Sequence, residues 1–232
     1  FKGTHMTKFI YFLTVFALTY SVMSQSINFI TPDYQQIKLR IEDKESMFYY
    51  PPLFERYVKN DTTITEEEMH YLYFGYTFQK NYSPYYRHSL LKDFVEYFKK
   101  ENINEADIRT IISMGNTILK DDPFNIRVMT LLGYTYYKKG DMDMAKVIWR
   151  KNAFVMNAIL SSGDGESDST AYYVINTADE YHIIRKMEAA FGQQGLSPYK
   201  DQMIDVMSIT DKNGDEKTLH FNVTRLFELN NK

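Results

Sequence analysis

Residues 122–152 read DPFNIRVMTLLGYTYYKKGDMDMAKVIWRKN, with apolar side chains at helical spacing on both sides of Gly140. Asp122-Pro123 predicts a cap and a first-turn proline, and Gly140-Asp141 predicts the end of that helix. The seam consists of Met129, Leu132, Gly133 and Tyr136 in the first helix and Ala145, Ile148, Trp149 and Asn152 in the second. Gly133 leaves room for a close neighbour. The stretch therefore predicts two helices that fold back on each other.

Three more helices are predicted upstream, each with one apolar face. Thr65 and Glu68 form a capping box ahead of a helix from about Glu66 to Phe78. Ser83-Pro84 and Asn104 predict the starts of the next two helices. Their inward faces are Leu91, Phe94, Val95 and Phe98, and then Ile108, Ile111, Ile112, Gly115, Ile118 and Leu119. Helices with one apolar face must pack on one another, so we expect a helical stack.

The pattern changes after residue 160. Residues 161–170 are rich in Ser, Gly and acids, which predicts a solvated, flexible link. Tyr172 to Ile175 is β-prone, and Thr177 to Glu180 resembles a capping box for a helix that Gly192 ends.

A β-hairpin is predicted near the end of the chain. The runs Ile204 to Ile209 and Leu219 to Val223 flank Asn213-Gly214, a two-residue turn signal. Pairing outward from that turn places Ser208 opposite Leu219, Val206 opposite Phe221 and Ile204 opposite Val223. The predicted fold class is α+β, with a mainly helical region over residues 25–160, a link over 161–170 and a small α/β region with the hairpin over 171–232.

The start of the sequence predicts export. Residues 1–5 precede Met6 and are interpreted as non-native or upstream residues, while residues 6–24 have the pattern of a signal peptide cleaved before Gln25. A membrane anchor is the alternative, but the fifteen uncharged residues from Phe9 to Met23 span only about 22 Å of a hydrocarbon core of about 30 Å. We expect a periplasmic or secreted protein with no integral membrane segment after signal removal.

Composition narrows the class of protein. Removing residues 1–24, which hold two lysines and no acid, leaves 25 basic and 30 acidic residues and a net charge of −5. This net charge does not indicate the basic surface that nucleic-acid-binding proteins have. The chain is 44% hydrophobic, which predicts a globular protein, and it has no cysteine for a disulfide, a thiol nucleophile or a thiolate metal site.

The stretch around Trp149 resembles a tetratricopeptide repeat. The residues that carry the resemblance are Leu132-Gly133-x-x-Tyr136, then Gly140, Ala145 and Trp149, with Pro123 in front. Leu119 to Pro123 is similar to the end of a preceding repeat, whereas nothing around Ser167 continues the pattern. The resemblance implies a short helical stack and no long array.

A second resemblance covers the whole mature chain. It rests on the stretches Tyr49-Tyr50-Pro51-Pro52-Leu53-Phe54-Glu55-Arg56-Tyr57, Tyr71-Leu72-Tyr73-Phe74-Gly75-Tyr76-Thr77-Phe78-Gln79 with Tyr82-Ser83-Pro84-Tyr85, and His220-Phe221-Asn222-Val223. These stretches resemble domain of unknown function 4919, a group of exported proteins of Bacteroides-type bacteria. The resemblance implies a periplasmic or secreted, partly repeat-like protein and supplies no catalytic residues.

No metal, cofactor or catalytic motif is predicted. Glu66 and His70 share one helix face, but two ligands do not make a zinc site. Asp211, Asn213 and Asp215 have the spacing of the first ligands of an EF-hand calcium loop. However, Glu216 occupies the position of the required Gly, and Asn222 that of the bidentate Glu. No nucleophile, metalloprotease or phosphate-loop motif is present. An enzyme that uses two of the thirty acids stays open, although the sequence selects no pair.

Two surfaces are candidates for binding. The face of the first helix that corresponds to a repeat groove carries Arg127, Thr130, Tyr134, Tyr137 and Lys138, which together suit a peptide. There are two alternatives to peptide binding. The face is an ordinary solvated surface, or the C-terminal region of the same chain fills the groove. The second candidate is a stacking platform for a sugar or peptide made of Tyr71, Tyr82, Tyr85 and Tyr86. The alternative is that these tyrosines belong to a core between packed helices and only their hydroxyl groups reach solvent.

Two hypotheses about function follow. The first is a non-catalytic binding or scaffolding protein of the cell envelope that holds a peptide or protein partner in the short groove. The second is a glycan-binding protein or a hydrolase that uses the tyrosine-rich segment and a carboxylate pair. The sequence favours the first, and it leaves the oligomeric state open.

Overall fold

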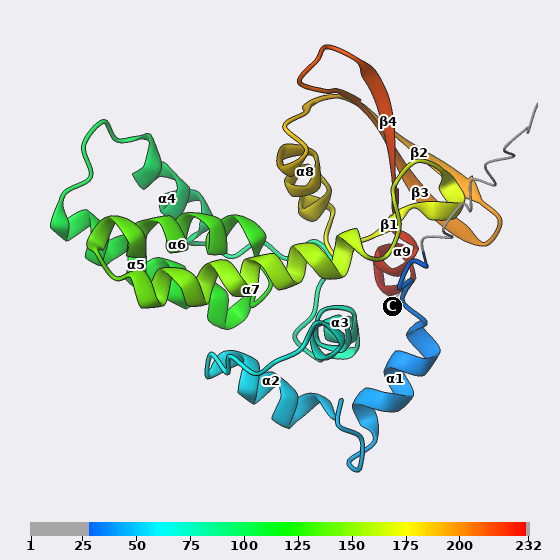
Figure 1. Cartoon of the computed structure of the whole chain (residues 1–232), viewed down its shortest axis with the longest axis horizontal. Helices are drawn as coiled ribbons and strands as arrows, with labels where there is room; N and C mark the ends of the chain where they lie inside the picture. The colour runs from blue at the N-terminus through cyan, green and yellow to red at the C-terminus, as the bar shows by residue number, and fades with distance from the viewer. Residues whose placement is uncertain (1–27, 231–232) are drawn as a thin grey trace, which may run out of the picture.

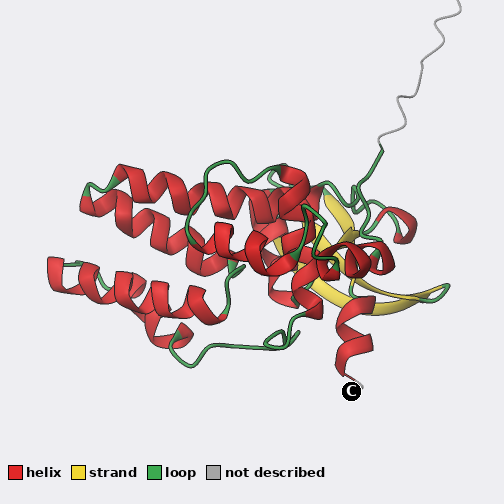
Figure 2. Cartoon of the chain, turned by 90° about the horizontal axis from the view of Figure 1, so that it is seen from below, coloured by secondary structure: helices red, strands yellow, loops and turns green. Residues whose placement is uncertain are grey.

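The fold is α+β, as predicted. A computed structural model describes residues 28–230, so the predicted signal over residues 6–24 lies outside the described residues. Figure 1 shows the helices of the first part of the chain on one side of the molecule and the sheet, contributed by the last part, on the other. Figure 2 shows the same division from below.

The helices are α1 (Tyr34–Glu42), α2 (Tyr50–Val58), α3 (Glu66–Gly75), α4 (Leu91–Glu96), α5 (Glu105–Asp121), α6 (Ile126–Lys139), α7 (Met142–Leu160), α8 (Thr177–Lys186) and α9 (Thr224–Asn230). The strands are β1 (Tyr172–Tyr173), β2 (Ala190–Tyr199), β3 (Gln202–Thr210) and β4 (Glu216–Asn222). Short 3-10 turns follow α3, α4 and the 161–167 stretch, at Tyr76–Phe78, Tyr97–Lys99 and Asp168–Thr170. Within residues 28–230, every helix is too short or too polar to cross a membrane.

The predicted helix pair is confirmed in α6 and α7, which lie side by side in Figure 1. Gly140 ends α6 in the left-handed region, at φ 86°, where glycine has no steric cost. Gly133 is fully covered by the Trp149 side chain of α7. A β-carbon at Gly133 would lie 2.5 Å from both Cδ1 and Nε1 of the Trp149 indole ring. The close approach expected at Gly133 is therefore real.

Asp122-Pro123 does not begin α6, contrary to the prediction. The N-cap is Asn125, whose side chain accepts a hydrogen bond from the Val128 N–H at 2.9 Å. Asp122 instead ends α5, because its backbone N–H donates to the Ile118 carbonyl. The Pro123 carbonyl accepts the Tyr57 hydroxyl at 2.9 Å, which fixes the turn between the two helices.

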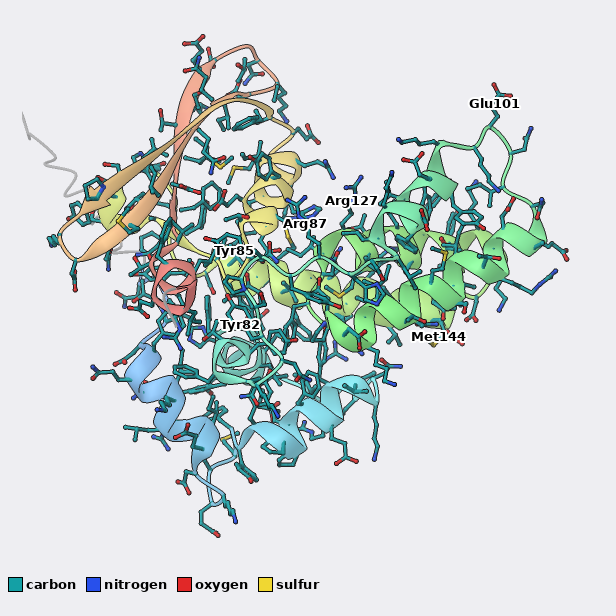
Figure 3. The ribbon with its side chains drawn as sticks, turned by 180° about the vertical axis from the view of Figure 1, so that it is seen from behind. Tyr82, Tyr85, Arg87, Glu101, Arg127 and Met144 are labelled. Atoms are coloured by element: carbon teal, nitrogen blue, oxygen red, sulfur yellow. The ribbon has the colours of Figure 1, made fainter. Side chains whose placement is uncertain are left out.

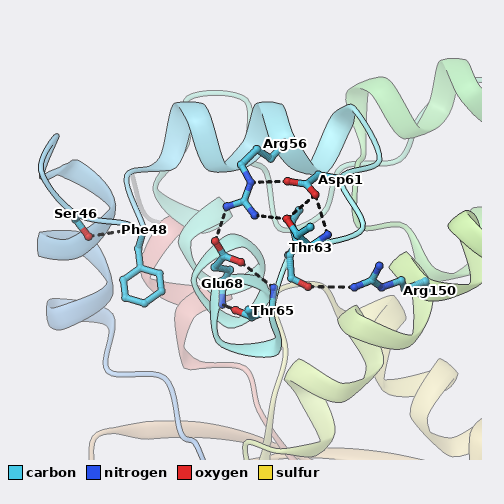
Figure 4. A network of polar contacts seen from close by, with 9 residues as sticks. Ser46, Phe48, Arg56, Asp61, Thr63, Thr65, Glu68 and Arg150 are labelled. Atoms are coloured by element: carbon cyan, nitrogen blue, oxygen red, sulfur yellow. Dashed lines mark hydrogen bonds and ion pairs between the residues drawn. The ribbon is translucent and has the colours of Figure 1, made fainter.

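The start of α3 is confirmed in detail. Thr65 and Glu68 form the reciprocal capping box, and the helix continues into the 3-10 turn that ends at Phe78. Figure 4 shows that Arg56 of α2 joins this box by an ion pair with Glu68 and a second with Asp61. The network locks the α2–α3 connection, because the Glu68 carboxylate serves the cap and the guanidinium together.

The segment over residues 79–90 is a loop, so the helix predicted to start at Ser83-Pro84 is wrong. Turns close it through Tyr82 N–H to Gln79 O (3.0 Å) and Tyr86 N–H to Ser83 O (3.1 Å). Tyr85, Tyr86, Arg87 and Ser89 are exposed and only His88 is buried, so this segment has no apolar face whose packing would stabilise a helix. The apolar face that follows is correct, since Phe94 in α4 is fully buried.

The hairpin is confirmed, but its register differs by one residue. The strands of the sheet lie in the order β1-β4-β3-β2, with β1 parallel to β4 and the other pairs antiparallel. Asp205, not Val206, pairs with Phe221, because residues 211–215 form a longer loop that the Asp211 N–H closes on the Asp215 carbonyl. A shift of one residue turns each side chain to the opposite face. The shift carries the carboxyl group of Asp205 into the buried side of the sheet.

Two further predictions in this region are wrong. Asn176, not Thr177, caps α8, through its side-chain oxygen and the Ala178 N–H at 2.9 Å. Gly192 ends no helix and lies inside the edge strand β2. The sequence AFGQQGLSPY has weak strand propensity, and β2 forms because β3 supplies its hydrogen-bonding partner.

Residues 161–170 are packed, which corrects the prediction of a flexible link. Ser162 and the glycines at 163 and 165 are buried, and the N–H groups of Asp164 and Gly165 both donate to the Thr170 carbonyl. The Asp168 carboxylate lies 2.7 Å from His220 Nδ1 on β4. One apolar cluster includes side chains from α1, α2, α3, α6, α7, α8, α9 and the sheet, so most helices and the sheet share a core. Phe94 of α4 packs in a second, smaller cluster with Ile111, Ile118 and Val128.

The Gly133–Trp149 contact yields a stability prediction. Gly133→Ala should destabilise the protein by about 1–2 kcal/mol, because the new methyl group displaces the indole ring. With Trp149→Ala already present, the same change should be neutral or stabilising, since Ala favours a helix over Gly by up to about 1 kcal/mol. Urea unfolding of the four proteins measures the coupling. An equal loss in both backgrounds contradicts the contact.

Candidate functional site

A cleft opens between the 79–90 loop, the start of α6 and the outer side of α8. Its volume is about 400 Å³. The lining residues that matter most are Tyr85, Tyr86, Arg87, Arg127, Tyr181, His182 and Arg185. Figure 3 labels Tyr85, Arg87 and Arg127, which lie near one another although they come from the loop and from α6. We call this space the arginine cleft.

Three arginines supply all of the formal charge on the lining. Arg87 comes from the loop, Arg127 from α6 and Arg185 from α8, and each is exposed. Within the part of the chain that the structure describes, none of the three forms an ion pair. Their guanidinium groups remain available for a ligand.

His182 lies among these cations as a neutral imidazole. Burial, followed by the charges of Arg185 and Arg127, lowers the pKa of His182 to about 4. The ring is therefore unprotonated at neutral pH, and it can accept a hydrogen bond as well as donate one.

Two tyrosines hold the walls of the cleft together. The Tyr82 hydroxyl donates to the Ile175 carbonyl at 2.6 Å, and the Tyr73 hydroxyl accepts the Ile175 N–H at 3.2 Å. Both polar groups of the residue before the α8 cap are thereby bound to side chains from α3 and the loop. The clamp fixes the start of α8 relative to the 79–90 loop.

A smaller pocket of about 40 Å³ continues inward from the cleft. It is lined by Asp122 and Asp179, together with Tyr76, Tyr82, Tyr86 and Phe124. Burial raises the pKa of Asp179 to about 7, although the hydrogen bond from the Tyr73 hydroxyl (2.6 Å) opposes that shift. Burial also raises the pKa of Asp122. The space is about that of one water molecule, so a sugar ring does not fit between these acids.

A second carboxyl pair lies on the inner side of α8, and neither of its residues lines the cleft. Glu180 is fully buried opposite Asp205 of β3, which also accepts a hydrogen bond from Gln194 at 2.6 Å. Burial, followed by the charge of Asp205, raises the pKa of Glu180 to about 10. Glu180 therefore keeps its proton at neutral pH, although neither of its carboxyl oxygens has a hydrogen-bond partner within the described residues.

The structure divides the predicted groove face. Arg127 reaches the arginine cleft, whereas the Thr130 hydroxyl accepts a hydrogen bond from Asn152 at 2.9 Å. Tyr134 and Tyr137 are 43% and 49% exposed, and their ring centroids are 6.4 Å apart. Lys138 lies 5.5 Å from the Tyr134 ring centroid. These last three form a separate aromatic surface farther along α6.

The predicted tyrosine platform is also divided. Tyr71 is 8% exposed and stacks on Phe48 with ring centroids 3.9 Å apart, so it belongs to the core. Tyr82 is half-buried, while Tyr85 and Tyr86 are 48% and 39% exposed on the cleft wall. The structure thus combines two residues of the platform with one residue of the groove face.

Sequence reasoning missed Arg87, His182 and Arg185 as site residues. Arg185 and His182 are three residues apart on α8, which places them on one helix face. No sequence pattern near α8 predicts that this face lies against α6. Arg87 follows Tyr85-Tyr86 in a segment that was predicted to be helical. Among residues 28–230, no three His, Asp or Glu side chains are grouped as metal ligands.

Comparison with known proteins places the chain in a family. The family model described as a domain of unknown function (DUF4919) matches residues 35–232, so the chain belongs to this family. The family resemblance seen in the sequence is confirmed. No curated protein and no solved structure matches the chain.

The buried pair predicts an unusual dependence of stability on pH. Because the folded pKa of Glu180 is raised from 4.5 to about 10, its contribution is complete below pH 4.5 and is lost as pH rises toward 10. Glu180→Gln removes the cost of keeping the proton, and we expect it to raise the free energy of unfolding by several kcal/mol, up to about 5 kcal/mol, at pH 8. At pH 4.5 the gain should almost vanish.

Chemical denaturation at the two pH values measures this effect. Glu188→Gln is the matched control, because Glu188 lies just past the same helix and its side chain is 69% exposed. It should change stability much less at either pH. A destabilisation by Glu180→Gln of the same size at both pH values contradicts a protonated Glu180.

Proposed function

We propose that this protein is a non-catalytic binding protein of the cell envelope, which holds a peptide segment of a protein partner. The observation that carries the proposal is the arginine cleft, where three unpaired cations and two exposed tyrosines meet. A volume of about 400 Å³ lies within the usual range for ligand sites, about 300–1,000 Å³. The aromatic rings offer contact area at little entropic cost.

The helix pair supports a repeat-like origin for this surface. We propose that α6 and α7 are a tetratricopeptide-like unit, with Gly133 accepting Trp149 as its internal packing contact. The start of α6 then contributes Arg127 to the groove, and α8 supplies the opposite wall. The groove is partly occupied by the C-terminal half of the chain, one of the alternatives considered from the sequence.

Binding is favoured over hydrolysis by the dimensions of the inner pocket. Two acids that act on a glycosidic bond lie about 5–10 Å apart on either side of it, which requires the sugar to enter between them. The pocket that contains Asp122 and Asp179 has room for about one water molecule. A glycan that stacks on Tyr85 and Tyr86 remains the alternative occupant of the outer cleft.

The envelope location rests on the start of the sequence and on the family. Residues 6–24 have the pattern of an export signal. The resemblance to exported Bacteroides-type proteins agrees with this. We therefore propose that residues from Gln25 onward work in the periplasm or outside the cell.

A photo-crosslinking experiment tests the proposal. Benzoylphenylalanine placed at Tyr85, on the wall of the cleft, should crosslink to a discrete polypeptide in cells that naturally make the protein. The same probe at Leu39 of α1, which is 72% exposed and outside the cleft, is the matched control and should give no such product. Mass spectrometry of the product identifies its chemical class.

Two results would contradict the proposal. Polypeptide products of equal yield from both positions would show that the cleft has no preference for a partner. A carbohydrate adduct at Tyr85 without any polypeptide would favour the glycan alternative.

A further inference from the structure

The charge on the cleft is opposite to that of the whole chain. The protein has 27 basic and 30 acidic residues, yet every formally charged residue on the lining is an arginine. Elsewhere in residues 28–230, several cations lie against acids, as in the pairs Lys100–Asp107 and Lys217–Asp211, both at 2.7 Å or less. The arginine cleft therefore holds a local excess of positive charge.

The backbone adds to this positive potential. The N-cap residues of α6 and α8, Asn125 and Asn176, both line the cleft. The two helices have 14 and 10 residues, and their positive dipole ends begin at this surface. The lowered pKa of His182 agrees with the same field, because Arg185 and Arg127 contribute to it after burial.

The nearby acids do not neutralise the arginines. Asp179 accepts the Tyr73 hydroxyl inside the small pocket, and Glu180 points to Asp205 on the inner side of α8. Asp122 accepts a hydrogen bond from Asn125 Nδ2 at 2.8 Å. None of these three carboxyls forms an ion pair with Arg87, Arg127 or Arg185 within the described residues.

We infer that the ligand of the arginine cleft is an acidic peptide segment. Its carboxylates would pair with Arg87, Arg127 and Arg185, and its apolar side chains would lie on Tyr85 and Tyr86. Arginine suits this role because its planar fork binds a carboxylate through two hydrogen bonds. The inference rests on the proposed function and specifies the chemistry of the peptide.

A peptide fits the lining better than a uniform polyanion does. Besides the arginines, the cleft exposes aromatic and apolar groups, among them Tyr181, Leu91 and Ala178. A peptide that alternates acidic and apolar side chains can pair with the arginines and also pack against the aromatic and apolar groups. An acidic oligosaccharide could pair with the arginines and stack on the tyrosines, but it has no apolar side chain to pack against Leu91 and Ala178.

Selection from a displayed library of short random peptides tests this inference on the full chain. Peptides enriched by the wild-type protein should carry an excess of Asp and Glu. Their affinity should fall about tenfold with each of Arg87→Gln, Arg127→Gln and Arg185→Gln, as expected for the loss of a charge-assisted pair. Rising salt should weaken binding in the same direction.

The matched control removes the same charge elsewhere. Arg40→Gln on α1, Arg109→Gln on α5 and Lys146→Gln on α7 change exposed residues outside the cleft. This triple variant should select the same acidic peptides with unchanged affinity. A second triple variant combines the three cleft substitutions Arg87→Gln, Arg127→Gln and Arg185→Gln. Far-ultraviolet circular dichroism and thermal unfolding verify that both triple variants remain folded.

Three outcomes overturn the inference. They are enriched peptides without an acidic excess, an equal loss of affinity in both triple variants, and displacement of the selected peptide by an oligogalacturonate at lower concentration than by the free peptide. Crosslinking at Tyr85 distinguishes failure of the acidic specificity from failure of the proposed function. A polypeptide crosslink combined with neutral selected peptides leaves the proposed function intact and removes only the acidic specificity.

Discussion

The arrangement of the functional surface depends on how the Tyr73 hydroxyl is buried. This group accepts the Ile175 N–H and donates to the Asp179 carboxylate at 2.6 Å, while no part of the Tyr73 side chain is exposed. A buried hydroxyl must find partners, because an unsatisfied one costs about 1–3 kcal/mol. The observed placement of α8 against α3 satisfies it. That placement brings the arginine of α8 to the same cleft as the arginine of α6.

The shared core gives the clamp its rigidity. Most helices before residue 160 and the sheet after residue 171 bury side chains in one apolar cluster, and the 161–170 stretch packs between them. Close packing of this kind leaves little freedom for α8 to move relative to α6. The cleft is therefore a preformed feature between fixed walls, which lowers the entropic cost of binding.

The distribution of charge supports the proposal that the site holds a ligand. Two of the carboxyl groups with raised pKa values, Asp179 and Glu180, are buried behind the surface, and Asp179 accepts a hydrogen bond from the Tyr73 hydroxyl. The groups that face solvent are arginines and tyrosines, which recognise anions and flat surfaces. Acid–base chemistry requires a titrating group within hydrogen-bond reach of the substrate. Within residues 28–230, the cleft lining has no carboxyl group, and its imidazole, His182, is partly buried among the arginines.

The sequence by itself determined the elements that local physics specifies. The capping box at Thr65, the helix start at Asn104, the glycine end of α6 at Gly140 and the contact of Gly133 with a neighbouring helix follow from side-chain spacing and backbone freedom. The sequence also identified Arg127 and the exposed tyrosines of the 79–90 loop as candidates. These signals lie within a few residues of one another, so no distant contact is needed to recognise them.

Tertiary structure alone decided the rest. The one-residue register that buries Asp205, the pairing that makes AFGQQGLSPY a strand, and the packing of the polar 161–170 stretch all depend on partners far along the chain. The arginine cleft is the clearest case, because Arg87, Arg127 and Arg185 are separated by 40 or more residues from one to the next. Their meeting is set by the burial of Tyr73 and Tyr82 against Ile175, and no local pattern encodes that contact.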